Sequence, residues 1–185
     1  MSGTHSAPIV VMGVSGCGKS TVAKILGRML GAEFIDADDR HSEGNKAKMA
    51  RGVPLDDIDR APWLEVLGRT LQERPNTVLA CSALKRRYRD DLRRFAPDAY
   101  FVHLNGTVES IASRLHLRHH EFMPSNLLES QFSALEPLEL DEFGTVLDVQ
   151  DPPDAIARAA LDALSTRSRE ATPAKRWENS TAASI

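Results

Sequence analysis

The sequence predicts an α/β fold of three layers, in which a five-stranded parallel sheet is covered by helices on both faces. One observation is the alternation of short apolar runs of strand length with segments of helical periodicity. A second is a glycine-rich loop between the first apolar run and the first helical segment. The runs expected to be strands are residues 9–12, 33–36, 77–81, 100–104 and 145–149. In such a sheet, ligands bind at the carboxyl ends of the strands.

Apolar residues recur at helical spacing between these runs. Pro62 is expected to start one helix, because proline is favoured in the first helical turn. The helical segments contain Val22, Ile25, Leu26 and Met29; Trp63, Leu64, Leu67 and Leu71; residues 85–95; Val108, Ile111, Ala112 and Leu115; and residues 154–164. We therefore expect one domain over residues 1–165. Residues 166–185 are polar and lose periodicity, so a mobile tail is expected there.

The composition excludes several classes of protein. The chain has 185 residues and a formal net charge of -3, so it lacks the basic field that would favour nucleic acid as a partner. No apolar run is long enough to span a membrane, and the N-terminus lacks the apolar core of a signal peptide. The two cysteines, Cys17 and Cys81, form no disulfide framework. These features predict a cytoplasmic protein that binds neither nucleic acid nor membranes.

Gly13, four further residues and then Gly18-Lys19-Ser20 match the phosphate-binding loop (P-loop) pattern. Small residues let consecutive backbone N–H groups surround a polyphosphate, and the helix that follows directs its positive end there. Lys19 can reach the β- and γ-phosphates, and Ser20 can bind the Mg²⁺ that bridges them. The pattern thus predicts Mg²⁺ and a nucleoside triphosphate, which we expect to be ATP. The ATP-binding residues predicted in this loop are Gly13, Ser15, Gly16, Cys17, Gly18, Lys19, Ser20 and Thr21.

A P-loop alone does not separate a kinase from a GTPase or an ATP-driven machine. The Asn-Lys pair at 45–46 lacks the aspartate that pairs with guanine, and the Asp-x-x-Gly at 141–144 follows it, which reverses the order found in GTPases. An ATPase would need a carboxylate at the end of a hydrophobic strand, but the third run is followed by Ser82 and Ala83. Both classes are therefore disfavoured.

Acidic residues lie at the end of the second strand instead, as Asp36, Asp38 and Asp39. Asp36 and Asp38 alternate along an extended chain, so their side chains point to the same side. One can face Mg²⁺ while the other meets an acceptor hydroxyl. On spacing alone, these residues can equally end the strand and solvate a turn.

Several longer stretches of the chain are more particular than the P-loop. They are FIDADDRH at 34–41, NKAKM at 45–49, GVPLDDIDRAPWL at 52–64, CSALK at 81–85 followed by Tyr88 and Arg89, and HEFMP at 120–124 with Leu127, Leu128 and SQF at 130–132. Together they resemble the small P-loop gluconokinases over residues 9–156. The resemblance implies the fold of the shikimate kinase and nucleoside monophosphate kinase group. It also implies transfer of the ATP γ-phosphoryl to the 6-hydroxyl of D-gluconate, which gives 6-phospho-D-gluconate.

The resemblance implies roles for individual residues as well. Asp38 would orient the acceptor hydroxyl and take its proton, while Asp36 would join Ser20 as an outer-shell Mg²⁺ residue. The gluconate carboxylate needs a cation, and its hydroxyls need hydrogen-bonding groups. The residues expected to bind the substrate are Asp38, His41, Lys48, Arg60, Lys85, Arg89 and Gln131.

Phosphoryl transfer must exclude water, so a helical lid is expected over residues 116–138. Arg114 and Arg118 lie one helical turn apart at its entrance and are expected to bind ATP phosphates. Arg118 then joins Lys19 and Asp38 as a catalytic residue. The resemblance also suggests a homodimer. Two alternatives remain, a kinase for another small hydroxy acid or polyol and a nucleotide-binding regulator without turnover.

Overall fold

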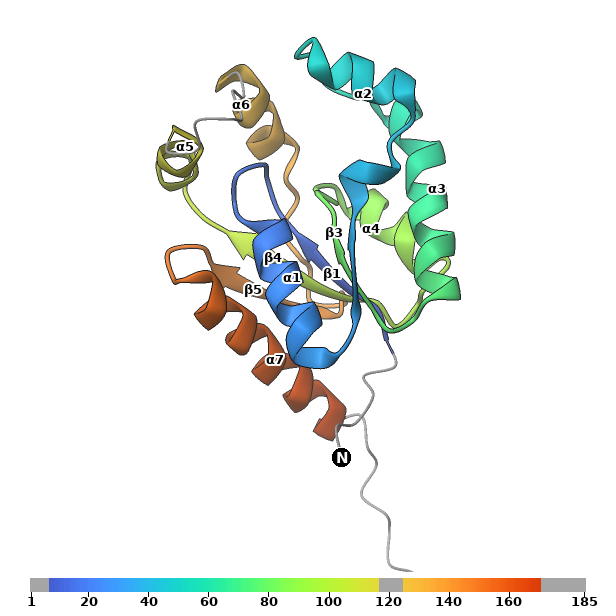
Figure 1. The fold of residues 1–185 in the computed structure, drawn as a ribbon, viewed down its shortest axis with the longest axis vertical. Helices are drawn as coiled ribbons and strands as arrows, with labels where there is room; N and C mark the ends of the chain where they lie inside the picture. Colours follow the sequence, from blue (N-terminus) through green and yellow to red (C-terminus); the bar gives the residue numbers. More distant parts are fainter. Residues whose placement is uncertain (1–6, 117–124, 171–185) are drawn as a thin grey trace, which may run out of the picture.

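The computed structural model describes residues 7–116 and 125–170, and its three layers confirm the predicted α/β fold (Figure 1). One sheet carries five parallel strands in the order β2-β3-β1-β4-β5. The strands are β1 (Ile9–Met12), β2 (Glu33–Asp36), β3 (Thr77–Ala80), β4 (Tyr100–Asn105) and β5 (Gly144–Asp148). Each strand end lies within about one residue of the predicted run, which is the usual precision of such boundaries.

Helices flank both faces of the sheet, with α1 and α7 on one face and α3 and α4 on the other (Figure 1). The helices are α1 (Lys19–Leu30), α2 (Glu43–Ala50), α3 (Asp57–Glu73), α4 (Arg86–Arg93), α5 (Val108–His116), α6 (Ser125–Ala134), α7 (Pro153–Glu170) and the 3₁₀ helix η1 (Ala37–Arg40). Among the described residues, no helix combines the length and the apolar composition that a membrane crossing needs.

β1 lies at the centre of the sheet, between β3 and β4, and all four of its residues are buried. Burial on both faces explains why its sequence is apolar without interruption. Alternate side chains point to opposite faces. Ile9 and Val11 pack into the core beneath α1 and α7, whereas Val10 and Met12 pack into the core beneath α3 and α4. The strand that leads into the P-loop is therefore held from both sides.

α3 begins at Asp57, so the predicted helix start at Pro62 is wrong. Asp56 and Asp59 form a capping box: Oδ1 of Asp56 accepts from the Asp59 N–H at 2.8 Å, and Oδ2 of Asp59 accepts from the Asp56 N–H at 3.1 Å. Pro62 is exposed and lies in the second turn of α3, where its missing N–H leaves the carbonyl of Ile58 without its helical partner. As a result, Arg60 stands on a helix rather than in a loop.

α2 is a helix that the sequence does not predict, because it shows no clear apolar periodicity, whereas α6 lies within the helical lid expected over residues 116–138. α2 starts at a polar cap instead, where the Ser42 hydroxyl accepts from the Asn45 N–H at 3.2 Å. α7 continues to Glu170, so residues 166–170 are helical and do not belong to a tail. Residues 171–185 of the predicted tail and 117–124 of the predicted lid lie outside the described residues.

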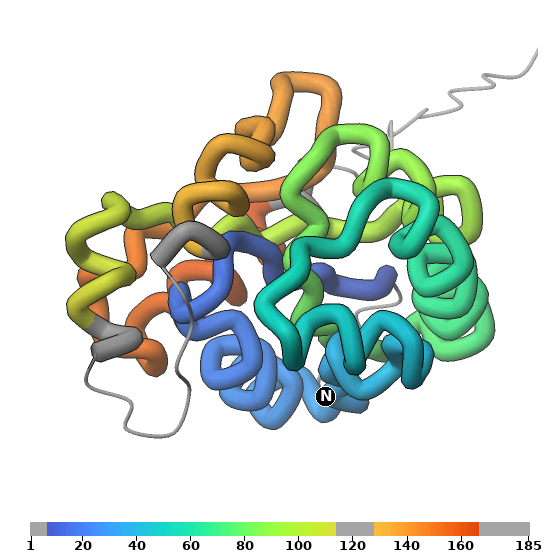
Figure 2. Tube along the Cα trace, turned by 90° about the horizontal axis from the view of Figure 1, so that it is seen from above, coloured from blue at the N-terminus to red at the C-terminus, as the bar shows by residue number. Residues whose placement is uncertain are grey.

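Figure 2 views the carboxyl ends of the strands from above. The P-loop, between β1 and α1, lies near the middle of this edge. η1, α2 and the start of α3 stand on one side of it, and we call residues 37–60 the helical arm. α5 and α6 stand on the opposite side. The fold thus places the P-loop between two helical segments that come from distant parts of the chain.

Candidate active site

The P-loop backbone takes conformations that favour glycine. φ is 140° at Gly13, 81° at Gly16 and 99° at Gly18. A Cβ at Gly13 would also lie 2.7 Å from the carbonyl oxygen of Leu104. Because α1 begins at Lys19, its first N–H groups and its positive dipole end face the loop. This geometry suits the binding of phosphate.

Ser20 contacts the end of β2, and the Lys19 side chain lies over the P-loop. The Lys19 ammonium donates to the carbonyl oxygen of Val14 at 3.0 Å, which holds it over the loop. The Ser20 hydroxyl donates to Oδ2 of Asp36 at 2.7 Å, and Oδ1 of Asp36 accepts from the Asp38 N–H at 3.2 Å. The structure therefore brings together Ser20 and Asp36, the two residues predicted to serve the metal.

This hydroxyl and carboxylate suit Mg²⁺, which takes oxygen ligands and is usually held by one or two protein groups, substrate phosphates and several waters. Among residues 7–116 and 125–170, no group of three or more His, Cys, Asp or Glu side chains could hold a metal ion. A cation beside Ser20 would therefore need water and phosphate oxygens to complete its coordination. Asp36 would act through its hydrogen bond to Ser20 or through water.

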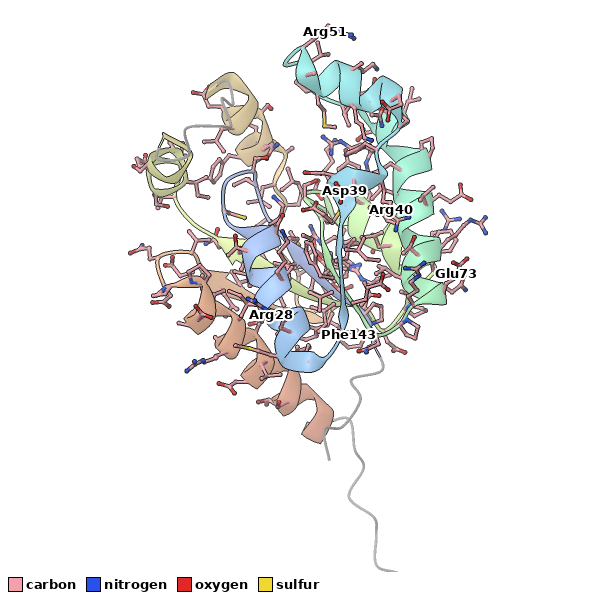
Figure 3. The ribbon with its side chains drawn as sticks, viewed as in Figure 1. Arg28, Asp39, Arg40, Arg51, Glu73 and Phe143 are labelled. Atoms are coloured by element: carbon pink, nitrogen blue, oxygen red, sulfur yellow. The ribbon has the colours of Figure 1, made fainter. Side chains whose placement is uncertain are left out.

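Asp38 lies on η1, beside Asp39 and Arg40, which Figure 3 labels above the end of β2. Its side chain is 78 % exposed, so a ligand can reach it. Partial desolvation by the surrounding protein raises the pKa of Asp38 above its ordinary value, and the positive charge of Lys19 opposes that rise. Asp38 is thus within electrostatic reach of the P-loop lysine.

His41 follows η1 and is only 6 % exposed. Burial, together with the positive charges of Arg60 and Lys46, lowers the pKa of His41 to about 4. Its ring is therefore neutral at pH 7. His41 can exchange hydrogen bonds with a substrate hydroxyl, but it adds no positive charge for a carboxylate.

Two of the predicted cations are already paired with carboxylates from the start of α3. Lys48 donates to both oxygens of Asp59, at 2.6 and 2.8 Å. Lys85 donates to Asp57 at 3.2 Å, and Asp57 also contacts the Tyr88 hydroxyl. Either lysine would have to share or exchange its partner to bind an acid.

Arg60 differs from these lysines, because it takes part in no ion pair between described residues. Its Nε donates to the carbonyl oxygen of Leu55 at 3.3 Å, and its guanidinium lies 5.5 Å from the centre of the Tyr88 ring. Its charge also influences the pKa values of Asp38 and His41. Arg60 is the predicted cation best placed to receive a carboxylate beside Asp38.

The structure corrects the predicted substrate contact of Arg89. This side chain is 0 % exposed, and its Nε and Nη2 each donate to Glu142 at 2.7 Å. The remaining donors bind the carbonyl oxygens of Ala83, Leu84, Glu136 and Pro137. Arg89 therefore joins α4 to the segment before β5 and has no donor left for a ligand. Its partner lies 53 residues away in the sequence, so helical spacing could not reveal the pair.

Removing Glu142 should destabilise the fold strongly. Burial alone would raise the pKa of Glu142, but hydrogen bonds from Arg89, the Glu139 N–H and Arg93 lower it to about 2. Glu142→Ala leaves the Arg89 charge buried without a partner, so we expect a loss of about 3–5 kcal/mol in the free energy of unfolding. Urea denaturation at pH 7 measures it.

Glu139→Gln is the matched control for this variant. Glu139 is 66 % exposed and pairs with Arg86 at the surface, so the expected loss is below about 1 kcal/mol. The contribution of Glu142 is fully present above its ordinary pKa of 4.5 and is lost as the pH falls toward 2. The difference between the parent and Glu142→Ala should therefore shrink over that range. Equal stability of the two variants at pH 7 would contradict the role of the pair.

Gln131 lies at the phosphate loop rather than beside the arm. Its Oε1 accepts from the Ser15 N–H at 2.6 Å, and its Nε2 lies 3.5 Å from the Ser15 hydroxyl. α6 therefore contacts the P-loop directly, through a backbone donor that a phosphate would use. Arg114 belongs to α5, and Arg118 lies outside the described residues.

Comparisons with known proteins agree with this geometry. The shikimate kinase family model matches residues 15–139. A probable gluconokinase of Rattus norvegicus is 45% identical over 178 residues, which cover 84% of this chain and 96% of the relative. The gluconokinase of Arabidopsis thaliana is 44% identical over 174 residues, covering 85% and 92% of the two chains. The crystal structure of a gluconokinase from Sinorhizobium meliloti 1021 superposes with a TM-score of 0.85 at 43% identity, covering 89% of this chain and 95% of that one. The chain therefore belongs to the gluconokinase family, whose fold it shares with the shikimate kinases.

Proposed function

We propose that this enzyme transfers the γ-phosphoryl group of ATP to the 6-hydroxyl of D-gluconate and releases ADP and 6-phospho-D-gluconate. The observation that carries the proposal is the arrangement at the carboxyl edge of the sheet. Lys19 of the P-loop and Arg60 both lie within electrostatic reach of Asp38, an exposed carboxylate, and Arg60 has no carboxylate partner among the described residues. An alcohol acceptor that carries an acid fits this combination of groups.

The reaction is an in-line displacement in which positioning and electrostatics do most of the work. The 6-oxygen of gluconate forms a bond to the γ-phosphorus, and the bond from that phosphorus to the β–γ bridging oxygen breaks. The electron pair of the broken bond stays on ADP, and the hydroxyl proton passes to the Asp38 carboxylate. Lys19 neutralises charge that develops on the phosphate oxygens.

The chemistry that Mg²⁺ would supply at this site is positive charge to offset that of the ATP phosphates. Ser20 would supply a hydroxyl ligand to the ion, and Asp36 would hold that hydroxyl in place through their 2.7 Å hydrogen bond. Because Asp36 accepts from both Ser20 and the Asp38 N–H, it would also link the metal side of the site to the base. When ATP binds, the Ser15 N–H would donate to a phosphate oxygen in place of Oε1 of Gln131.

Acceptor binding is assigned to the helical arm and α4. Arg60 would bind the gluconate carboxylate, and Lys48 and Lys85 would reach the substrate from their pairs with the first turn of α3. His41 and Asp38 would contact hydroxyls. Arg114 and Arg118 remain proposed ligands of the ATP phosphates, at the entrance to a lid over residues 116–138.

We further propose that the enzyme acts in the cytoplasm as a homodimer. The cysteines Cys17 and Cys81 are both buried, and a chain with so few cysteines suits a reducing compartment. The dimer is supported by the resemblance to gluconokinases. Sedimentation velocity of the full chain tests the oligomeric state.

A coupled assay of ADP release, run over gluconate, other sugar acids and uncharged polyols, tests the function directly. Gluconate should be the preferred acceptor. Faster turnover of another acid or of a polyol would replace gluconate as the substrate. No ADP release with any acceptor would favour a nucleotide-binding regulator.

Arg60→Gln should raise the KM for gluconate by roughly 10- to 100-fold, because a hydrogen bond to a charged group is lost. The KM for ATP should not change, since Arg60 lies on the helical arm and not on the P-loop. Arg69→Gln is the matched control, because Arg69 lies on the same helix and pairs with Glu65 at the surface. An unchanged gluconate KM in Arg60→Gln would move carboxylate recognition to Lys48 or Lys85.

A further inference from the structure

The His41 ring is fixed relative to η1, the element that carries Asp38. It stacks on Trp63, with ring centres 4.2 Å apart and an angle of 13° between the planes. The Trp63 indole N–H donates to the carbonyl oxygen of Ala37 at 2.8 Å, and the His41 N–H donates to the carbonyl oxygen of Asp38 at 3.3 Å. The ring thus packs against α3, and the backbone of the same residue is hydrogen-bonded to η1.

The two ring nitrogens of His41 have different surroundings. Nδ1 is buried and has no hydrogen-bond partner among the described residues, whereas Nε2 lies 3.9 Å from Oδ1 of Asp38. The ring is neutral because its pKa is about 4, so it carries one proton. A carboxylate oxygen lies near Nε2, and Nδ1 has no acceptor, so the proton is more stable on Nε2.

A distance of 3.9 Å is too long for a hydrogen bond, but a shift of about 1 Å brings the pair to normal length. Asp38 is exposed and stands on a short 3₁₀ helix, so its side chain can make that shift when a ligand arrives. The other charges that face Asp38 are Lys19, Asp36, Asp39 and Arg60. Those that face His41 are Arg60 and Lys46.

We propose that His41 is a positioning residue for Asp38: its Nε2–H donates to Oδ1 of Asp38 in the substrate complex and leaves Oδ2 directed at the acceptor hydroxyl. This inference rests on the proposed function, in which Asp38 takes the proton of that hydroxyl. It assigns His41 a neutral donor role at the base, in addition to any contact with the substrate. Without the donor, Asp38 would be free to rotate and would hold its proton more tightly.

Three substitutions of His41 separate its role as a hydrogen-bond donor from its stacking on Trp63. Glutamine places an amide N–H near the position of Nε2, asparagine places one near Nδ1, and phenylalanine keeps the ring on Trp63 without any donor. We expect kcat with gluconate to fall roughly 10- to 100-fold in His41→Phe and His41→Asn, and less than about fivefold in His41→Gln. The acid limb of the pH profile of kcat should move to higher pH in His41→Phe and stay near its place in His41→Gln.

The result that would overturn the proposal is a His41→Phe enzyme with the kcat and pH profile of the parent, or a His41→Gln enzyme as slow as His41→Phe. Thermal unfolding of each variant shows whether a loss reflects folding instead. A ¹⁵N histidine spectrum of the substrate-free protein, assigned with His41→Phe, should show a neutral ring protonated at Nε2. This spectrum needs no turnover, so an Nδ1-protonated ring would refute the inference even if gluconate is the substrate. An inactive parent with an Nε2-protonated ring would refute the proposed function alone.

Discussion

Replacing Lys19 with alanine is expected to lower kcat by roughly three powers of ten or more, because the variant lacks the cation that neutralises charge on the transferring phosphate. Lys19 begins α1 at the mouth of the P-loop and is held there by the carbonyl oxygen of Val14 at 3.0 Å. The position of the Lys19 side chain does not depend on a contact with the helical arm. The loss should therefore appear with every acceptor that the enzyme uses.

The fold should survive the Lys19 substitution, since its side chain is only partly buried and makes a single hydrogen bond to the described part of the chain. Circular dichroism and thermal unfolding check this. Lys24→Ala is the matched control, because Lys24 lies on the same helix, is exposed and contacts the Phe34 ring away from the P-loop. Turnover of Lys19→Ala close to that of Lys24→Ala would remove the phosphate role from this loop.

Asp38→Asn is expected to separate catalysis from nucleotide binding. The variant keeps the size of the side chain and much of its hydrogen bonding but loses the base and its charge. ATP should still bind, because the P-loop is unchanged. We expect kcat to fall by about two to four powers of ten, the usual contribution of general acid–base catalysis. The fall is smaller where the loose transition state of phosphoryl transfer needs little proton removal by a base.

Titration of ATP into the Asp38→Asn protein and measurement of its kcat with gluconate test both halves of this prediction. In the parent, Asp38 must be deprotonated, and desolvation raises its pKa, so activity should be lost on the acid side above the ordinary pKa of an aspartate. That acid limb should be absent from the residual activity of the variant. Asp39→Asn is the control, because Asp39 is its exposed neighbour (Figure 3). Turnover of Asp38→Asn within a few-fold of the parent would move the base to Asp36 or Asp39, or show that none is needed.

The sequence by itself determined the features that depend on neighbouring residues. The inner strands β1, β3 and β4 were predictable because a doubly covered parallel sheet needs continuous apolar runs, whereas the edge strands β2 and β5 are only partly buried and were recognised from shorter apolar runs. The P-loop was predictable because a close approach of backbone to phosphate requires glycine at fixed spacing, and in the structure Gly13, Gly16 and Gly18 take positive φ values. Asp36 and Asp38 were recognised from their place at the end of β2, since the chain order alone puts them at the carboxyl edge of the sheet.

Only the tertiary structure decided which charged side chains are available to a ligand. Arg60, Lys85 and Arg89 look equivalent in sequence, but Arg89 is buried and paired with Glu142, Lys85 is paired with Asp57, and Arg60 has no carboxylate partner in the part of the chain that the structure describes. The start of α3 was missed because a capping box overrode the signal of Pro62. The physical reason is common to these cases. A charge takes the partner that packing brings within about 4 Å, and that partner can lie anywhere in the chain, so local pattern identifies the chemistry of a residue but not the contact it makes.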